Sequence, residues 1–190
     1  SAAEKKWTSS EAADGFILVV NDGGPTLGYH PSSGVQIITV DGFAFKDLNK
    51  NGTLDPYEDW RRPTDERARD LAGRMTIEEM AGLMLYSSHQ DISADMTEDQ
   101  KRFLVDEHVR AFLIANYTSK GDAARWNNVA QAYAEGIASG IPINTSSDPR
   151  SSTSSGEAYS SGDGEISLWP GTLGIAATFV LICSNMVISA

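Results

Sequence analysis

The stretch DLNKNGTLDPYED, residues 47–59, has oxygen-bearing residues at the spacing of a calcium-binding loop. Gly52, at the sixth position, permits the sharp turn of such a loop, and the carbonyl of Thr53 can serve as a ligand. Calcium is a hard cation that takes about six to eight oxygen ligands, and Glu58 can bind it through both carboxylate oxygens. We therefore predict a structural Ca²⁺ site whose ligands are Asp47, Asn49, Asn51, Thr53, Asp55 and Glu58.

The flanks of this loop differ from those of a paired calcium-sensor motif. The entering segment has the pattern of a strand, and Pro56 lies inside the loop. A single loop has no second loop to couple with, so we interpret it as a clip that joins the β segment to the first helix. The alternative is a turn rich in Asn and Asp whose side chains satisfy the turn's own backbone without a metal.

A second candidate site follows a predicted buried strand, in the sequence SSDPR, residues 146–150. In parallel α/β sheets, ligands bind beyond the carboxyl ends of the strands. A carboxylate at Asp148 can accept hydrogen bonds from two neighbouring sugar hydroxyls, and Arg150 can orient that carboxylate or reach the ligand. The alternative is a helix cap, or a surface ion pair between these two residues.

Composition narrows the classes of function. The chain has 190 residues and a formal net charge of −11, which argues against nucleic acid or an anionic membrane surface as a partner. Cys183 is the only cysteine, so no internal disulfide can form. The apolar tail, residues 173–190, is interrupted by polar residues and has no basic anchor, so we predict no membrane span. The sequence has no nucleotide-binding glycine motif, no G-x-S-x-G and no C-x-x-C.

The elements that must position these residues change in character along the chain. Residues 15–46 have the pattern of β structure, with the apolar run GFILVV and the β-branched run VQIITV separated by turn residues. After Pro63 the pattern is helical. Helix N-caps are predicted at Thr64, Thr76 and Thr97, and the last two have the Glu or Gln of a capping box three residues later.

The second half of the chain has the pattern of a βαβ unit. The apolar run at 111–116 predicts a strand covered on both faces, and residues 122–139 have apolar side chains at helical spacing with Gly140 as C-cap. Residues 141–148 predict a second buried strand. A strand, a helix and a strand in this order imply a parallel sheet with a right-handed crossover.

The combination of motifs closely resembles the N-terminal part of family 3 glycoside hydrolases, which are β-glucosidases and related exo-acting enzymes. The resemblance rests on VDGFAFKDLNKNGTLDPYEDWRRPTDERARDLAGRMTIEEMAGLML, then IPINTSSDPR, then GEISLWPGTLGIAATF, and runs from about residue 16 to Phe179. The stretch DERARDLAGRMTIEEMAGLML matches the helix pair that opens the barrel domain of that family.

The resemblance implies a (β/α)8 barrel followed by an α/β sandwich, and a retaining mechanism. In such enzymes an aspartate from the later part of the barrel attacks the anomeric carbon, and a carboxylic acid protonates the leaving group. By the same resemblance, Asp148 matches the family aspartate that grips hydroxyls of the sugar in the −1 subsite. Arg150 matches a frequent neighbour of that aspartate.

The chain departs from the family in its length and in its last residues. A barrel needs about 250 residues, and here the recognisable barrel begins near residue 65. The nucleophile, the general acid and a Lys-His pair that also grips the sugar are therefore expected beyond the end of the chain. The tail at 180–190 does not resemble the family, and a shifted reading frame could encode a family-like segment there, so we hypothesise a frameshift.

The predicted fold class is α/β: a partial (β/α)8 TIM-type barrel, formed by the first βα units, after a short β-rich segment with the calcium loop. Residues 1–63 are the β-rich extension, 64–179 the start of the barrel domain, and 180–190 the non-family tail. A partial barrel leaves a strand edge and an apolar face open, so we expect either self-association or packing of the tail residues 180–190 where the missing strands would lie.

The predicted function is that of an N-terminal fragment of a retaining β-glucosidase-type enzyme, which hydrolyses terminal β-D-glucosyl or related residues. The fragment supplies part of the −1 subsite and is expected to be inactive alone. The alternative is a non-catalytic, calcium-stabilised module that binds carbohydrate or protein. The sequence leaves the location open, with a secreted or periplasmic one favoured over the cytoplasm.

Overall fold

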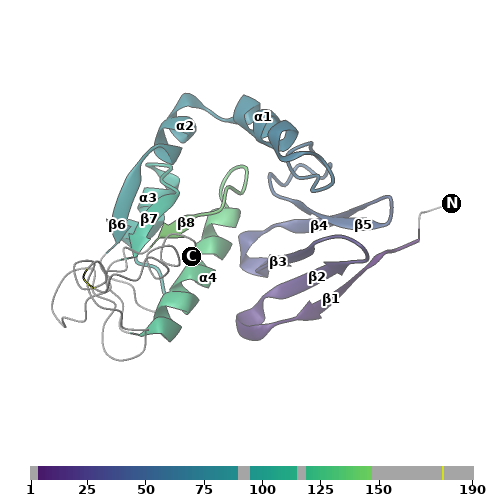
Figure 1. Cartoon of the computed structure of the whole chain (residues 1–190), viewed down its shortest axis with the longest axis horizontal. Helices are drawn as coiled ribbons and strands as arrows, with labels where there is room; N and C mark the ends of the chain where they lie inside the picture. Colours follow the sequence, from purple (N-terminus) through teal and green to yellow (C-terminus); the bar gives the residue numbers. More distant parts are fainter. Residues whose placement is uncertain (1–3, 90–94, 115–118, 147–176, 178–190) are drawn as a thin grey trace.

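The computed structural model describes residues 4–89, 95–114, 119–146 and 177. These residues form an antiparallel β segment, at the right of Figure 1, and an α/β part at the left, with α1 and α2 between them along the top. The α/β class is therefore confirmed. The predicted tail at 180–190 lies outside the described residues.

The N-terminal segment contains two antiparallel sheets. One has the strand order β1-β2-β3, and the other is the β4-β5 hairpin. The prediction of β structure over 15–46 is confirmed, whereas β1 was not predicted, because nearly all of its residues are exposed and the strand therefore lacks an apolar pattern. The strands are β1 (Trp7–Glu11), β2 (Ile17–Asn21), β3 (Thr26–Tyr29), β4 (Gln36–Val40) and β5 (Phe43–Asp47).

The buried side chain of Asn21 joins the two sheets. Its Oδ1 accepts a hydrogen bond from the backbone N–H of Ala44 at 2.7 Å, and its Nδ2 donates to the carbonyl oxygens of Ala44 and Pro25, both at 3.2 Å. Val19 and Phe45 are fully buried in this segment. A buried amide with all these partners costs little to desolvate and fixes how β2 and β5 meet.

The helices begin where the sequence places their caps, with one exception. Both predicted capping boxes are present, because Thr76 accepts from the N–H of Glu79 at 3.1 Å and Thr97 accepts from the N–H of Gln100 at 3.2 Å. The prediction for Thr64 is wrong, since Pro63 holds the cap position and Thr64 is the first helical residue. The helices are α1 (Thr64–Arg74), α2 (Ile77–Leu83), α3 (Glu98–Val105) and α4 (Lys120–Glu135).

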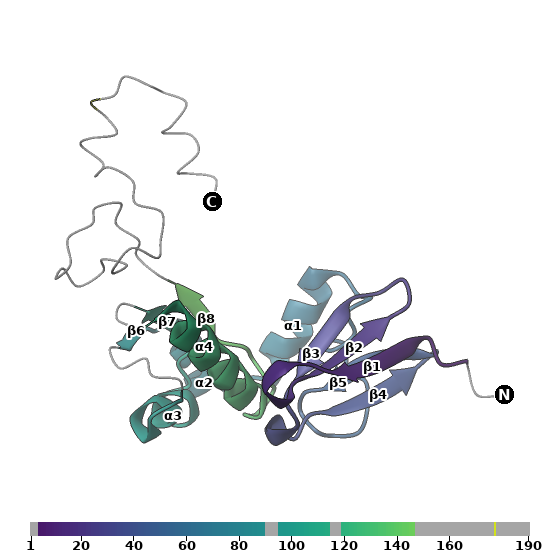
Figure 2. The ribbon, with the colours of Figure 1, turned by 90° about the horizontal axis from the view of Figure 1, so that it is seen from below.

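The predicted parallel sheet is confirmed for the described residues. Its strand order is β6-β7-β8, both pairings are parallel, and Leu113 of β7 lies opposite Ser146 of β8. The strands are β6 (Tyr86–His89), β7 (Ala111–Ile114) and β8 (Asn144–Ser146). Figure 2 shows α4 lying across this sheet, which gives the strand–helix–strand unit expected from the sequence.

Two predicted boundaries are wrong. The helix expected over 122–139 ends at Glu135, and beyond it Ala138 has a left-handed φ of 46°, which a continuing α-helix does not allow. The strand expected over 141–148 begins only at Asn144. Just before this strand, the side-chain amide of Gln131 accepts from the N–H of Ile143 at 3.1 Å and donates to its carbonyl at 2.8 Å. These two backbone groups therefore do not pair with a neighbouring strand.

The core of the α/β part gathers around Trp126, which is 1% exposed. Its indole N–H donates to Gln100 Oε1 at 3.0 Å, which ties α4 to the N-terminus of α3. A buried indole with a hydrogen-bond partner adds specificity to its large apolar contact. The other buried members of this core are Met96, Leu104, Val109, Phe112, Ala130, Ala134 and Ile143.

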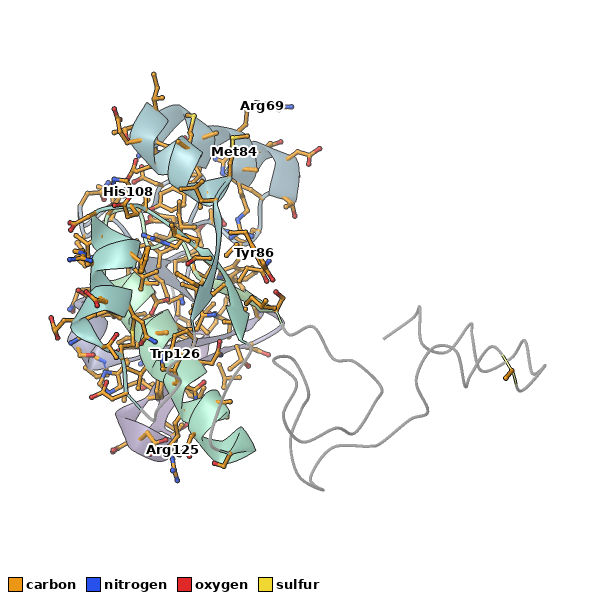
Figure 3. The ribbon with its side chains drawn as sticks, turned by 90° about the vertical axis from the view of Figure 1, so that its left-hand side faces the viewer. Arg69, Met84, Tyr86, His108, Arg125 and Trp126 are labelled. Atoms are coloured by element: carbon orange, nitrogen blue, oxygen red, sulfur yellow. The ribbon has the colours of Figure 1, made fainter. Side chains whose placement is uncertain are left out.

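The apolar face of α2 and the start of β6 is exposed. Ile77 is 80% exposed and Met84 is 87% exposed, and Figure 3 shows Met84 and Tyr86 on this side of the molecule. The apolar residues of this face, called here the α2–β6 face, are Ile77, Met80, Leu83, Met84, Leu85 and Tyr86. No buried residue lies in α1 either. None of the described helices is long and apolar enough to cross a membrane.

Gly82 in α2 and Gly73 in α1 give a matched test of how closely α2 packs against the residues around His108. A Cβ at Gly82 in α2 would lie 2.5 Å from Cβ of His108 and 2.6 Å from the carbonyl oxygen of Glu107, whereas a Cβ at Gly73 in α1 would meet nothing within 4 Å. We expect Gly82→Ala to lower the free energy of unfolding by about 1–3 kcal/mol. Gly73→Ala should instead raise it by roughly 0.5–1 kcal/mol. Urea denaturation measures both, and equal effects would contradict the close approach.

Candidate functional site

The loop at 47–59 is built around two buried carboxylates, those of Asp47 and Glu58, whose residues are 3% and 5% exposed. The oxygens of Asp47 accept hydrogen bonds from the backbone N–H groups of Asn51 and Gly52, at 3.0 and 2.9 Å. Glu58 Oε1 accepts from the N–H of Leu48 at 2.7 Å, and so closes the loop from its far end. The inward direction of both carboxylates agrees with the sequence prediction.

Two amides hold Asp55 in the centre of the loop. Asn49 Nδ2 and Asn51 Nδ2 both donate to Asp55 Oδ2, at 2.6 and 2.7 Å. Burial raises the pKa of the Asp55 carboxyl, but these hydrogen bonds and the charge of Arg74 outweigh burial and bring the pKa below its ordinary value. The glycine expected at the sharp turn is confirmed, because Gly52 has φ +79°.

Several contacts fasten the loop to α1. Arg74 Nη2 donates to Asp55 Oδ1 and Arg74 Nε to Asp70 Oδ2, both at 2.9 Å, and Asp70 Oδ2 accepts from the N–H of Tyr57 at 3.2 Å. The hydroxyl of Tyr57 is buried with no hydrogen-bond partner in the described part of the chain. Burial and the negative charge of Glu58 raise the pKa of Tyr57. The loop therefore joins β5 to the first helix, as the clip interpretation expects.

The residues after the loop turn the chain back over β5. The rings of Trp60 and Phe45 are stacked with centroids 5.3 Å apart, and the indole N–H donates to the carbonyl of Ala44 at 3.0 Å. Arg61 donates through Nε and Nη2 to the two carboxylate oxygens of Asp59, both at 2.9 Å. These hydrogen bonds from Arg61 hold the pKa of Asp59 below its ordinary value.

The loop as described is satisfied by its own hydrogen bonds, which is the arrangement of the metal-free alternative. Within the described ranges, no three or more His, Cys, Asp or Glu side chains are placed so that they could hold a metal ion. The Asn49 and Asn51 amides turn their nitrogens toward Asp55, and a half-turn of each amide would present an oxygen instead. The calcium ligands therefore stay a prediction.

The carboxyl ends of the parallel strands are the place where the sequence predicts the sugar contacts. Asp148 and Arg150 lie outside the described residues, and Ser146 is the last described residue before them. The hydroxyl of Tyr86 in β6 hydrogen-bonds to the hydroxyl of Ser146 in β8, so side chains of the two outer strands meet over β7. The sheet geometry required by the predicted site is present, and the roles of Asp148 and Arg150 stay predictions.

The structure also contains a cavity of about 560 Å³ that the sequence did not indicate. It lies between the N-terminal β segment and α4, and it is lined by residues from segments far apart in the chain. No local spacing or motif connects these segments, so the cavity could be found only after the chain had been folded.

Comparison with known proteins identifies relatives that are all named as β-glucosidases. A periplasmic beta-glucosidase/beta-xylosidase from Dickeya chrysanthemi is 41% identical over 157 residues, which cover 76% of this chain. Beta-glucosidase C from Emericella nidulans is 33% identical over 69% of this chain, and a probable beta-glucosidase C from Aspergillus oryzae is 30% identical over 67%. The matches cover 23%, 22% and 21% of these relatives, so the chain spans less than a quarter of their length. No protein-family model matches the chain.

The attachment of the loop to α1 can be tested with two arginines of that helix. Arg74 bonds to Asp55 and Asp70, whereas Arg69 makes no hydrogen bond or ion pair with the described residues and points to solvent in Figure 3. We expect Arg74→Gln to lower the melting temperature, because Asp55 loses its cationic partner. Arg69→Gln should leave it unchanged. Equal melting temperatures for the two variants would contradict the attachment.

Proposed function

We propose that this chain, which belongs to the β-glucosidase-like glycoside hydrolases and corresponds to their N-terminal part, supplies the first βα units of a family 3 retaining enzyme. The parent enzyme hydrolyses terminal β-D-glucosyl or related residues. The observation that carries the proposal is the 41% identity over 157 residues to a beta-glucosidase/beta-xylosidase. The parallel β6-β7-β8 sheet, connected through α3 and α4, supports it, because this is how a (β/α)8 barrel begins.

In this proposal the chain carries part of the sugar site and none of the groups that break the glycosidic bond. Asp148 grips hydroxyls of the sugar in the −1 subsite, with Arg150 beside it, and both follow β8 directly in sequence. The nucleophile and the general acid belong to the part of the relatives that this chain does not match. A secreted or periplasmic location is proposed as well, because the Dickeya relative is a periplasmic enzyme by name.

The proposal predicts sugar binding without turnover. Incubation of the chain with an aryl β-glucoside should release no phenol beyond the uncatalysed rate, because hydrolysis needs a nucleophile and an acid. In a titration with methyl β-D-glucoside followed by NMR, the backbone signals of Ile114 and Ser146 at the strand ends should shift. Asp148→Ala should abolish these shifts. Stoichiometric turnover by the chain alone, or shifts that persist in Asp148→Ala, would contradict the assignment.

We propose further that the 47–59 loop binds Ca²⁺ as a structural clip, through the ligand set predicted from the sequence. Support comes from the buried carboxylates of Asp47 and Glu58 and from the positive φ of Gly52 at the turn. The ion would replace internal hydrogen bonds of the loop. By binding oxygens from both ends of the loop, it would fix the position of β5 relative to α1.

Calcium removal tests the clip. At free Ca²⁺ about 100 times the dissociation constant, binding to the folded state alone adds about 2.7 kcal/mol of stability. We therefore expect a higher melting temperature in Ca²⁺ than in EDTA. Glu58→Gln should remove this difference, while Glu78→Gln in the exposed first turn of α2 should keep it. Identical melting curves of the unmodified chain in Ca²⁺ and in EDTA would reject the site.

The α2–β6 face supports a second proposal, that copies of the chain associate. Exposed apolar patches of this kind mark surfaces that are covered in a complete assembly, and β6 and β8 are both edge strands of the described sheet. The alternative function, a non-catalytic binding module, uses the same face for a protein that completes the sheet.

Sedimentation velocity separates these cases. We expect the chain to form dimers or larger species, and Met84→Lys to shift it toward monomer, because a charge in the covered face opposes burial. Val105→Lys is the control, since Val105 is an exposed apolar residue of α3 outside the α2–β6 face. A monomer at all concentrations would contradict self-association.

A further inference from the structure

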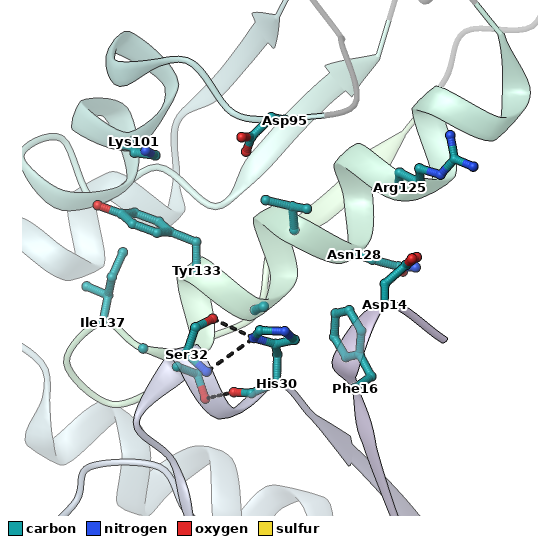
Figure 4. Close-up of a pocket in the computed structure, with 14 residues that line it drawn as sticks. Asp14, Phe16, His30, Ser32, Asp95, Lys101, Arg125, Asn128, Tyr133 and Ile137 are labelled. Atoms are coloured by element: carbon teal, nitrogen blue, oxygen red, sulfur yellow. Dashed lines mark hydrogen bonds between the residues drawn. The ribbon is translucent and has the colours of Figure 1, made fainter. Parts of the chain in front are cut away.

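The cavity of about 560 Å³ has a size typical of small-molecule sites, which are about 300–1,000 Å³. Figure 4 shows it between the two short 3-10 turns of the β segment, η1 (Ala13–Gly15) and η2 (Pro31–Ser33), and the helix α4. None of its described lining residues belongs to the parallel sheet, so it is separate from the strand ends. The face of α4 that lines it differs from the one that buries Trp126 and Ala130 in the core.

Two polar side chains at the rim have no partner among the described residues. Asp14 of η1 and Asn128 of α4 are exposed, and neither makes a hydrogen bond or an ion pair within the described part of the chain. Figure 4 shows the two side chains on the same side of the cavity, beside Phe16. A carboxylate offers only acceptors, and an amide offers both a donor and an acceptor. Together they can bind neighbouring hydroxyl groups.

The histidine on the wall adds a second nitrogen. Nδ1 of His30 accepts from the backbone N–H of Ser32 at 3.1 Å and lies 2.6 Å from the Ser32 hydroxyl, an arrangement that favours the tautomer with the proton on Nε2. A Cβ at Gly15 would lie 3.2 Å from that Nε2, so the glycine leaves the nitrogen open. The rings of His30 and Phe16 meet edge to face, with centroids 5.1 Å apart. This pair forms a half-buried aromatic wall.

The charges around the cavity favour a neutral ligand. Asp95, a second carboxylate that lines it besides Asp14, accepts from the N–H of Met96 at 2.8 Å. The two cationic side chains that line it already face carboxylates, since Lys101 Nζ lies 2.8 Å from Glu98 and Arg125 Nη1 lies 3.8 Å from Asp122. The chain as a whole has a net charge of −11, which disfavours phosphate or carboxylate ligands. The donors of Asn128 and His30 in turn disfavour a cation. What remains is a neutral ligand with several hydroxyls and an apolar ring face.

We propose that this cavity is a second carbohydrate site, which holds a neutral sugar by the Asp14 carboxylate, the Asn128 amide and the His30 Nε2–H, with a sugar face against Phe16. The choice of a sugar rests on the proposed function. The site lies away from the strand ends and therefore holds a sugar without cleaving it.

An NMR titration of the full chain with cellobiose tests this site. Saturable shifts are expected at the backbone amides of Gly15, Ser32 and Gly136. Asn128→Ala should weaken the binding roughly tenfold, the loss that corresponds to about 1.4 kcal/mol of hydrogen bonding. Asp14→Asn should weaken it at least as much, and Asn tolerates the left-handed backbone of this position, where φ is 56°. Asn144→Ala, an exposed asparagine outside the cavity, is the matched control.

The same titration distinguishes the second carbohydrate site from the proposed sugar site at the strand ends. Shifts at the cavity that are lost in Asn128→Ala and kept in Asp148→Ala support the second site, whatever happens at the strand ends. Shifts confined to Ile114 and Ser146, and lost in Asp148→Ala, overturn the second site and leave the proposed function standing. No saturable shift at the cavity, the same shifts with inorganic phosphate, or equal binding by Asn128→Ala and Asn144→Ala also overturns it.

Discussion

A parallel β-sheet is normally covered on both faces, and its edge strands are protected from further pairing; these two constraints govern the described part of the molecule. The β6-β7-β8 sheet has α4 and its core around Trp126 on one side, yet β6 and β8 each lack a further strand among the described residues. The exposed apolar residues of α2 and β6 follow from the same shortage. In a complete barrel, later strands close the sheet and its helices enclose such faces. The α2–β6 face and the edges of β6 and β8 are the surfaces that such a barrel would cover.

The N-terminal segment is held to the end of α4 by polar contacts. Lys46 of β5 pairs with Glu135 at the end of α4, and Lys50 Nζ donates to the carbonyl of Gly136 at 2.9 Å. Arg67 and Arg74 of α1 donate to the Tyr57 carbonyl and to Asp55. Through these contacts and those with α4, the region around the 47–59 loop connects the β segment to the helices. The cavity between η1, η2 and α4 lies at the same junction, so a ligand there would contact both parts of the chain.

The sequence predicted those features that depend on neighbouring residues. The capping boxes at Thr76 and Thr97, the left-handed Gly52 and the order of strand, helix and strand are all local patterns. Features that depend on distant contacts were missed. The strand β6, with the sequence YSSH, has no apolar pattern and exists because it pairs with β7. The left-handed Ala138 after the end of α4 and the Gln131 contact before the start of β8 also had no signal in the sequence. The direction of the loop carboxylates was predictable, whereas their hydrogen bonds to the loop backbone were one of two open alternatives.

The central claim is that these strands are the beginning of a glycosidase barrel whose remaining part carries the bond-breaking groups. Co-expression of the chain with the part of the Dickeya chrysanthemi relative that follows the matched region tests it most directly. The account predicts that the two polypeptides co-purify as one complex, that the complex hydrolyses an aryl β-glucoside, and that Asp148→Ala in the short chain greatly reduces this activity. Polypeptides that do not associate, or a complex whose activity is unchanged by Asp148→Ala, would contradict it.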